Sequence, residues 1–326
     1  MLRRVPDRHC WRGALVAQGW EVCQRRAKWF SLESHPENAP MADVITSRDN
    51  KWLKQFRAAL RGTGPRSGEP IGVEGPKLIE EALRSGLEAE ALLVSDGGER
   101  EAGRILKAAE ASDAGISRSR VLRTTDKLFE GVAGTEAPQG VAALFRQREW
   151  EFDDVLHGPG ELRASSPLVI VLAAVQDPGN VGTILRSAEA FGATGAVASR
   201  GTADPWSPKA LRASAGSALR LPVLRGLAIP VVLAQLKMAN VRIYAASSAR
   251  ADRAGEADLR EPAAIFVGNE SSGVPAEVER AADAIISIPM AETVESLNAG
   301  VAASLVLYEA ARQRNAAARG EPRSEA

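Results

Sequence analysis

The chain is poor in the residues that build many metal and nucleophile sites. Its 326 residues include two cysteines and three histidines, and neither type occurs after His157. The C-terminal half therefore cannot hold a Cys/His zinc site, a cysteine nucleophile or a Ser–His–Asp triad. Two cysteines give no disulfide framework, which fits a reducing cytoplasm. We expect no bound metal.

Long apolar runs and an excess of one charge are also missing. The longest apolar stretches, such as residues 168–175 (LVIVLAAV), are far shorter than the ~20 residues that a membrane helix needs. Lys plus Arg and Asp plus Glu each number 41, which excludes a uniformly basic coat for nucleic acid but not a local basic patch. The 45 % apolar content excludes disorder of the whole chain and supplies cores for about two domains.

The first residues differ from the rest in composition. Residues 1–40 contain both cysteines, two of the three histidines and three of the six tryptophans, but no continuous apolar segment of a secretory signal. Their arginines resemble those of a transit peptide, whereas their acidic residues count against one. We interpret residues 1–42 as a disordered extension, or as the product of a start codon placed too early, with Met41 as the true start.

Strand-like and helix-like patterns alternate in two later segments, which predicts sheets with helices packed on them. Leu53, Phe56 and Leu60 recur at helical spacing in a segment with six Lys or Arg and two Asp over residues 43–66, which predicts a basic amphipathic helix. Its charged face is either a phosphate-facing surface or an ordinary solvated face over a small core. A further helix is predicted over residues 207–220 (SPKALRASAGSALR). The predicted divisions are an extension at 1–42, a basic helical arm at 43–68, a small α/β domain at 69–146, a linker at 147–166, a second α/β domain at 167–315 and a tail at 316–326.

Three polar loops follow apolar strands of the second domain. No P-loop is present and no G-x-G-x-x-G follows a strand, so the usual nucleotide signatures are missing. The loops occupy residues 176–186 (QDPGNVGTILR), 266–275 (FVGNESSGVP) and 286–300 (ISIPMAETVESLNAG). Loops at the carboxyl ends of strands build ligand sites in open α/β sheets. Taken singly, each also fits a plain helix entry, with Asn180 as an N-cap in the first and Ser296 or Asn298 beginning a helix in the third.

Together the three loops resemble the motifs of the SpoU/TrmH-type RNA ribose 2′-O-methyltransferases, a family of the SPOUT superfamily. Residues 177–186 are similar to D-P-x-N-x-G-x-x-x-R, residues 268–273 to G-N-E-G-x-G, and residues 288–298 to I-P-M-x-G-x-x-E-S-L-N. Residues 212–217 (RASAGS) also resemble a segment of the family. Ser271 and Glu292 stand where the family has glycine.

The resemblance implies a fold and a reaction. The fold is α/β: a C-terminal SPOUT-type domain with a deep trefoil knot, preceded by a small L30e-like α/β domain that binds the RNA substrate. The reaction is methylation of a ribose 2′-OH in structured RNA with S-adenosyl-L-methionine as cofactor and no metal. The implied state is a cytoplasmic homodimer without a membrane partner. The L30e-like domain favours rRNA over tRNA as substrate.

The resemblance also assigns residues. The catalytic set is Asn180, Arg186, Glu270, Ser296 and Asn298. The residues expected to contact the cofactor are Gly268, Ile288 and Leu297. The residues expected to contact RNA are Lys51, Lys54, Arg57, Lys77, Lys209 and Arg212. Because no histidine is available, Arg186, Glu270 and Ser296 remain alternatives for the proton acceptor, and Arg186 suits a role as a fixed charge better because guanidinium normally stays protonated.

Three other interpretations stay open. The same scaffold serves a non-catalytic RNA-binding or ribosome-assembly factor if Glu292 impairs the cofactor loop. Another SPOUT activity, such as base methylation, needs the same fold and cofactor. An unrelated α/β nucleotide enzyme is disfavoured by the missing phosphate loops.

Overall fold

The structure is a computed structural model that describes residues 43–111, 121–158, 166–247, 252–291 and 293–319. These residues belong to one compact unit. The predicted extension at 1–42, Glu292 and residues 320–326 of the predicted tail lie outside the described residues. No helix in the described part of the chain is long and apolar enough to cross a membrane.

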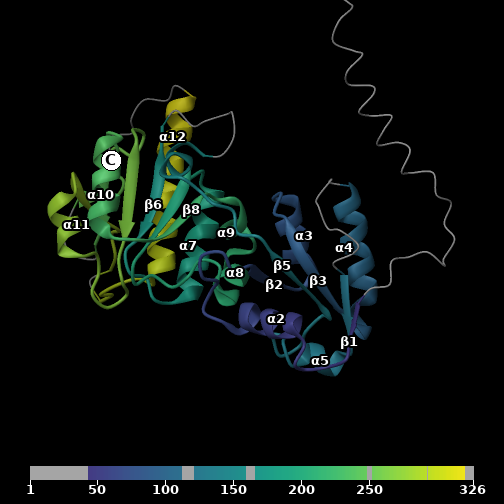
Figure 1. Ribbon diagram of the computed structural model, residues 1–326. Coiled ribbons are helices and arrows are strands. Elements are labelled where there is room, and N and C mark those ends of the chain that lie inside the picture. Colours follow the sequence, from purple (N-terminus) through teal and green to yellow (C-terminus); the bar gives the residue numbers. More distant parts are fainter. Residues whose placement is uncertain (1–42, 112–120, 159–165, 248–251, 292, 320–326) are drawn as a thin grey trace, which may run out of the picture. The chain divides into compact units, whose positions relative to one another are not determined.

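The first sheet has five strands in the order β1-β4-β3-β5-β2 (Figure 1). Strand β5 runs antiparallel to β3 and β2, and the remaining pairs are parallel. The strands are β1 (Asp43–Ile45), β2 (Ile71–Glu74), β3 (Ala89–Ser95), β4 (Val121–Thr124) and β5 (Val141–Phe145). The helices are α2 (Lys51–Arg61), α3 (Pro76–Arg84), the 3-10 turn η2 (Asp96–Gly98), α4 (Glu99–Ala111) and α5 (Asp126–Glu130).

Helices cover both faces of this sheet. Leu92 and Val94 pack with residues of α3 and α4 on one face, whereas Leu93 packs with residues of α2 and α5 on the other. Successive residues of a strand point to opposite faces, so β3 is apolar at nearly every position. The segment predicted as a helical arm is thus part of this layer: β1 pairs with β4, and Leu53 and Phe56 of α2 are fully buried.

The second sheet has seven strands in the order β10-β12-β9-β11-β6-β7-β8, and every pair is parallel. The strands are β6 (Leu168–Leu172), β7 (Gly195–Ser199), β8 (Val223–Leu227), β9 (Arg242–Ala246), β10 (Asp252–Arg253), β11 (Ala263–Val267) and β12 (Ala284–Ser287). The helices are α6 (Phe152–His157), α7 (Pro178–Ala190), α8 (Pro208–Ser214), α9 (Ser217–Arg220), α10 (Ile229–Met238), α11 (Ala276–Ala281) and α12 (Ala299–Ala318).

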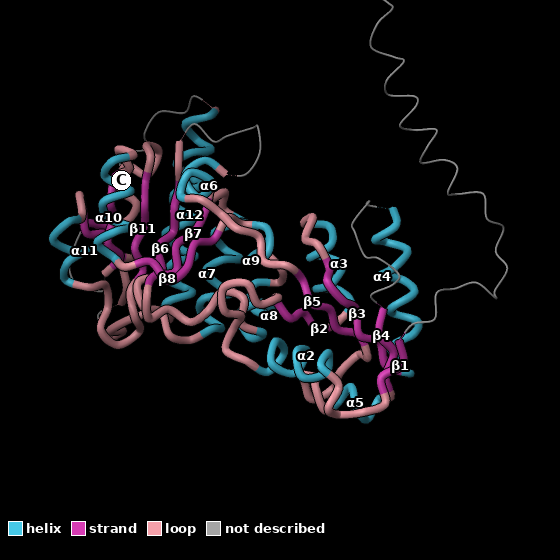
Figure 2. Tube along the Cα trace, viewed as in Figure 1, coloured by secondary structure: helices cyan, strands magenta, loops and turns pink. Residues whose placement is uncertain are grey.

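The apolar run at residues 168–175 forms strand β6 as far as Leu172, and this strand is buried on both faces. Leu168, Ile170 and Leu172 pack with α7, α8, α9 and α12, whereas Val169 and Val171 pack with α6, α10 and α11. Figure 2 shows β6 and β11 inside the second sheet, with helices around them. The central parallel strands therefore end at one shared edge, from which the polar loops extend.

One segment contains a helix that was not predicted, and one local prediction is wrong. The predicted linker at 147–166 contains helix α6, which is anchored by the buried Val155 against Gly195 of β7. The single helix predicted at 207–220 is two helices, because Ala215 (φ 49°) and Gly216 (φ 89°) adopt the left-handed region between α8 and α9. The apolar periodicity continues across this break, so it did not reveal the change of backbone conformation.

Substitution of Gly182 tests the packing of α7 on α8. A Cβ at Gly182 would lie 2.4 Å from the Ala210 carbonyl oxygen and 2.6 Å from Ala213 Cβ, so the backbones have to separate. We expect Gly182→Ala to lower the free energy of unfolding by about 1–3 kcal/mol. Urea denaturation followed by circular dichroism measures the change.

The matched control is Gly103→Ala in α4. A Cβ there meets nothing within 4 Å, so only the helix propensity changes, and stability should rise by up to about 1 kcal/mol. Equal midpoints for Gly182→Ala and the unmodified chain would show that α7 and α8 have room to spare.

Candidate active site

The loops that follow three neighbouring strands, β9, β11 and β12, enclose a pocket of about 410 Å³ at the carboxyl edge of the second sheet. Figure 2 shows loops gathered at one end of this sheet. The predicted cofactor residues Gly268, Ile288 and Leu297 all line this pocket. Glu270 and Ser296 line it too. The structure therefore brings together side chains from two of the three polar loops around one cavity.

Other lining residues escaped the sequence analysis. Ala246 and Ser247 come from the end of β9, and Ala302 and Val306 come from α12. The polar end of an apolar strand was the available signal for Ser247. The small residues Ala299 and Ala302 of α12 also line the cavity.

The loop after β11 is folded tightly on itself. Asn269 and Gly273 exchange two backbone hydrogen bonds of 3.0 and 2.9 Å, and a Cβ at Gly268 would lie 2.1 Å from the Gly273 carbonyl. The Asn269 side chain accepts from the backbone N–H of Ser271 and donates to the Ala174 carbonyl. Ser271 does not adopt a positive φ, so its replacement of the family glycine strains no backbone.

The N-cap of α7 is Asp177, not Asn180 as predicted. The Asp177 carboxylate accepts from the Gly179 N–H at 2.6 Å, and Pro178 starts the helix. Asp177 also binds the Lys209 ammonium at 2.8 Å. The hydrogen bonds from Lys209 and Gly179 hold the pKa of Asp177 below its ordinary value. Because Asp177 caps the helix, the Asn180 amide is available for other partners.

Asn180 connects the three polar loops through its side chain. Its Nδ2 donates to Glu270 Oε1 at 2.7 Å, and its Oδ1 accepts from Asn298 Nδ2 at 2.9 Å. Asn298 in turn caps α12, where its Oδ1 accepts from the Gly300 and Val301 N–H groups. One amide thus joins the entry to α7, the loop after β11 and the start of α12.

In the single chain, Arg186 lies apart from the hydrogen-bonded group of Asn180, Glu270 and Asn298. It lies six residues beyond Asn180 on α7, which turns it by about 240° around the helix axis and moves it about 9 Å along it. Its side chain is exposed and makes no hydrogen bond or ion pair with another described residue. The structure brings together four of the five predicted catalytic residues and leaves Arg186 outside the pocket.

The predicted RNA contacts are divided among three helices. On α2, Lys54 pairs with Asp49 at 3.3 Å, Arg57 donates to the Gly131 carbonyl and Lys51 lies over the Trp52 ring. Lys77 is exposed on α3. Lys209 and Arg212 are exposed on α8. Lys209 lies beside the first polar loop, since it binds Asp177, and Arg212 lines the same cavity as Gln176 and Pro178.

The chemistry of the pocket fits the cofactor that the resemblance implies. Its volume lies within the ~300–1,000 Å³ of small-molecule sites. Ile288, Leu297 and Val306 offer apolar walls to a ring, and the backbone of residues 268–273 offers polar groups. The carboxylates of Glu270 and Glu279 suit a cationic group. Among the described residues, no group of three or more His, Cys, Asp or Glu could hold a metal ion.

Comparison with known proteins gives consistent matches. Residues 167–308 match the SpoU rRNA Methylase family, and residues 67–143 match the MRM3-like substrate binding domain. A relative from Bacillus subtilis (strain 168), the 23S rRNA (guanosine(2553)-2'-O)-methyltransferase RlmP, is 33 % identical over 81 % of this chain and 97 % of its own.

Solved structures agree with these matches. The AdoMet-bound rRNA methyltransferase from Sinorhizobium meliloti has a TM-score of 0.69 and 28 % identity, covering 84 % of this chain and 98 % of its own. The SpoU methyltransferase AviRb from Streptomyces viridochromogenes, in complex with AdoMet, has a TM-score of 0.70 and 28 % identity, covering 82 % of this chain and 98 % of its own. The shared α/β fold, the three joined loops and the extent of these matches lead to one conclusion: the chain belongs to the SpoU rRNA methylase family.

Proposed function

We propose that this protein methylates a ribose 2′-OH in structured RNA, rRNA rather than tRNA, with S-adenosyl-L-methionine as cofactor. The observation that carries the proposal is the hydrogen-bonded series Glu270–Asn180–Asn298, which unites the three family motifs beside one pocket. The RlmP relative is named for ribose methylation of 23S rRNA, and 97 % of it is matched by this chain, which supports rRNA as the substrate.

The residues of the pocket have separate tasks in this reaction. When bound, S-adenosyl-L-methionine supplies an electrophilic methyl group. Gly268, Ile288 and Leu297 hold the cofactor, and the fixed Asn180 and Asn298 amides orient the ribose, so that little reorganisation is needed. Of the three candidate proton acceptors, Glu270 and Ser296 line the pocket. Arg186 is assigned to a substrate phosphate, where its permanent charge favours ionisation of the hydroxyl.

The family resemblance also implies details of the architecture of both domains. We propose a deep trefoil knot in the second domain, involving the loops after β11 and β12 that α12 follows. The first domain, at 69–146, is proposed as L30e-like and RNA-binding, and the match of residues 67–143 to a substrate binding domain supports this. We propose 167–315 as the bounds of the catalytic domain, and the family match at 167–308 supports them. We also propose a cytoplasmic location.

A methyl-transfer assay tests the reaction. The purified chain is incubated with methyl-labelled S-adenosyl-L-methionine and total RNA from a strain lacking the gene, and the RNA is digested to nucleosides. We expect label in a 2′-O-methylated nucleoside. Label on a base would overturn the ribose chemistry, and no label together with no cofactor binding would favour the non-catalytic RNA-binding alternative.

We also propose that two copies of the chain pack through α7 and α12. These helices lie side by side, with a 2.6 Å hydrogen bond between Ser187 and Ser304. On α12, Val301, Leu305 and Tyr308 are 47 %, 44 % and 53 % exposed and form an apolar stripe. A continuous exposed apolar stripe is typical of a protein interface, and a two-fold pair would cover both stripes at once.

Substitution of Leu305 tests the homodimer. A carboxylate in the apolar stripe would be desolvated on pairing, so we expect Leu305→Glu to sediment as a monomer at concentrations where the unmodified chain is a dimer. Val231→Glu on α10 is the control, because Val231 is similarly exposed (48 %) but lies outside the stripe. A dimer that survives Leu305→Glu would place the interface elsewhere.

Substitution of Asn180 tests the link between the three loops. Asn180→Asp loses the amide donor and sets a carboxylate beside Glu270, so kcat should fall by about 10- to 100-fold, equivalent to about 1–3 kcal/mol. Two adjacent carboxylates raise the pKa of one of them, and its protonated form can donate again. The activity of Asn180→Asp relative to the unmodified chain should therefore rise as the pH falls.

Asn180→Ala provides the comparison, since it removes the amide without adding a titratable group. Its relative activity should stay constant across the same pH range. A pH-independent ratio for Asn180→Asp would mean that Glu270 is not its functional partner.

Substitution of Arg186 separates charge from geometry. Lysine keeps the charge but not the planar fork that binds a phosphate through two hydrogen bonds. We expect Arg186→Lys to lose most turnover, about 10- to 100-fold, as charged hydrogen bonds contribute about 1.5–3 kcal/mol. Calorimetry should show unchanged affinity for S-adenosyl-L-methionine, since Arg186 lies outside the pocket. Near-normal turnover would refute a bidentate role.

A further inference from the structure

A second and larger cavity borders the candidate active site. It is a groove of about 1060 Å³, and it shares no lining residue with the cofactor pocket. Its walls come from residues 60–66 at the end of α2 and beyond it, residues 133–136 after α5, Gln176 and Pro178 at the entry to α7, residues 202–212 around the start of α8, and Arg225 of β8. Its volume is at the upper end of the ~300–1,000 Å³ typical of small-molecule sites.

The loop before α7 separates the groove from the pocket. Gln176 and Pro178 line the groove, and two residues further along Asn180 binds Glu270 of the pocket. Lys209 of the groove also binds Asp177 in this loop. A ligand lying in the groove thus passes next to the amide that we assign to orienting the ribose.

The walls of the groove are held in place by Arg225. Its guanidinium pairs with Asp204, donates to the Pro65 carbonyl and donates to Gln147 Oε1 at 2.9 Å. It also stacks on the Trp206 ring at 4.6 Å. These contacts fasten the segment after α2 to the second sheet, so the groove is a built feature of the fold.

Gly64 allows the segment after α2 to approach Asp204 closely. Its φ is 129°, and a Cβ there would lie 2.4 Å from Asp204 Cβ. Both the backbone conformation and the close contact require glycine at this position.

The charged residues that line the groove are mainly positive. Its lining contains five cations and two carboxylates: Arg61, Arg66, Lys209, Arg212 and Arg225 against Glu136 and Asp204. Three of the cations bind other groups of the protein. Arg66 and Arg212 are exposed and make no side-chain hydrogen bond or ion pair with another described residue. Two free guanidinium groups in a positive groove suit successive phosphates of a polynucleotide.

We propose that this groove binds the unpaired RNA chain next to the methylated ribose, with Arg66 and Arg212 contacting its phosphates. This inference rests on the proposed function and deepens it by naming the path and the strandedness of the substrate. An unpaired chain can follow a groove and turn one ribose toward Asn180, whereas an A-form duplex keeps its bases stacked and is recognised across its shallow minor groove.

Salt dependence of RNA binding tests the proposal. The probe is a short, fluorescently labelled single-stranded RNA of mixed sequence, titrated with the full chain at several salt concentrations. Each phosphate contact on a single strand contributes about 0.7 to the slope of log K against log salt, so Arg66→Gln/Arg212→Gln should reduce the slope by about 1.4. A duplex of the same length should bind more weakly and show no such reduction.

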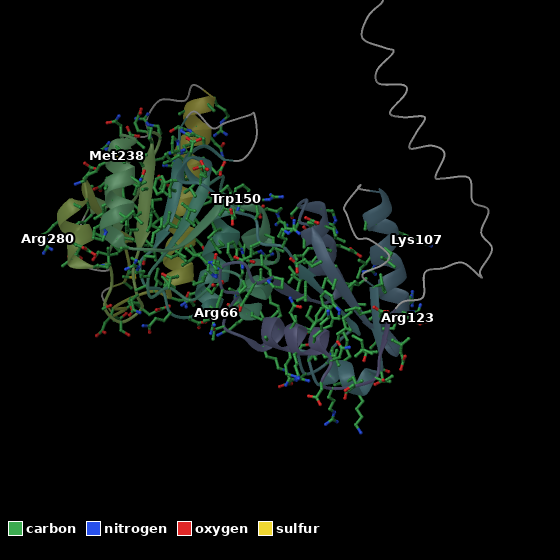
Figure 3. The ribbon with its side chains drawn as sticks, in the orientation of Figure 1. Arg66, Lys107, Arg123, Trp150, Met238 and Arg280 are labelled. Carbon is green, nitrogen blue, oxygen red and sulfur yellow. The ribbon has the colours of Figure 1, made fainter. Side chains whose placement is uncertain are left out.

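The matched control is Lys107→Gln/Arg280→Gln, which removes the same net charge from two exposed sites. Figure 3 shows Lys107 and Arg280 on opposite sides of the molecule, both away from Arg66. We expect its slope to equal that of the unmodified chain. Calorimetry with S-adenosyl-L-methionine shows that both double variants keep the cofactor pocket folded.

The possible failures can be told apart. Equal slopes for the groove and control variants, or an equal loss of duplex binding, would overturn the groove as the RNA path even if the unmodified chain methylates ribose. Methylation of a base by the unmodified chain would overturn the proposed reaction while leaving a groove-specific loss of slope intact. A reduced slope for the groove variant alone, with ribose methylation by the unmodified chain, supports both.

Discussion

The candidate site depends on one side-chain amide. Asn180 donates to Glu270 and accepts from Asn298, and these two contacts hold together segments that enter the site from three parts of the sheet edge. An amide suits this position because it offers a donor and an acceptor at once, whereas a carboxylate or an ammonium offers only one kind. The contact with Asn298 also fixes the first turn of α12, whose small residues border the candidate cofactor pocket.

Much of the arrangement could be predicted because its causes are local. The strand at 168–172 is visible as a continuous apolar run, and the loops after it and after residues 263–267 are visible as polar residues at strand ends. Parallel strands end at a common edge, so these loops were expected to meet, and Gly268, Ile288 and Leu297 do line one pocket.

The features that could not be predicted are those for which nearby residues have similar local preferences. Asp177 and Asn180 are both good N-caps, and only the geometry of Pro178 decides that Asp177 caps α7. The break at Ala215 is hidden because alanine usually favours helix. Because Asp177 is the cap, Asn180 lies inside α7, and all residues from Asn180 to Arg186 are helical. The side of the helix that Arg186 occupies therefore depends on which residue is the cap. The groove could not be predicted because its lining residues come from five segments that are distant in the sequence, and no pattern within one segment shows that the five meet.

The length of chain between the partners of Asn180 has a consequence for folding. Asn180 lies 90 residues before Glu270 and 118 residues before Asn298. Contacts of this separation close long loops and form late, in contrast to the local contacts within helices. During synthesis α7 leaves the ribosome well before α12 exists, so the nascent chain carries an incomplete pocket. The pocket therefore gains its last wall only when the last helix has been made.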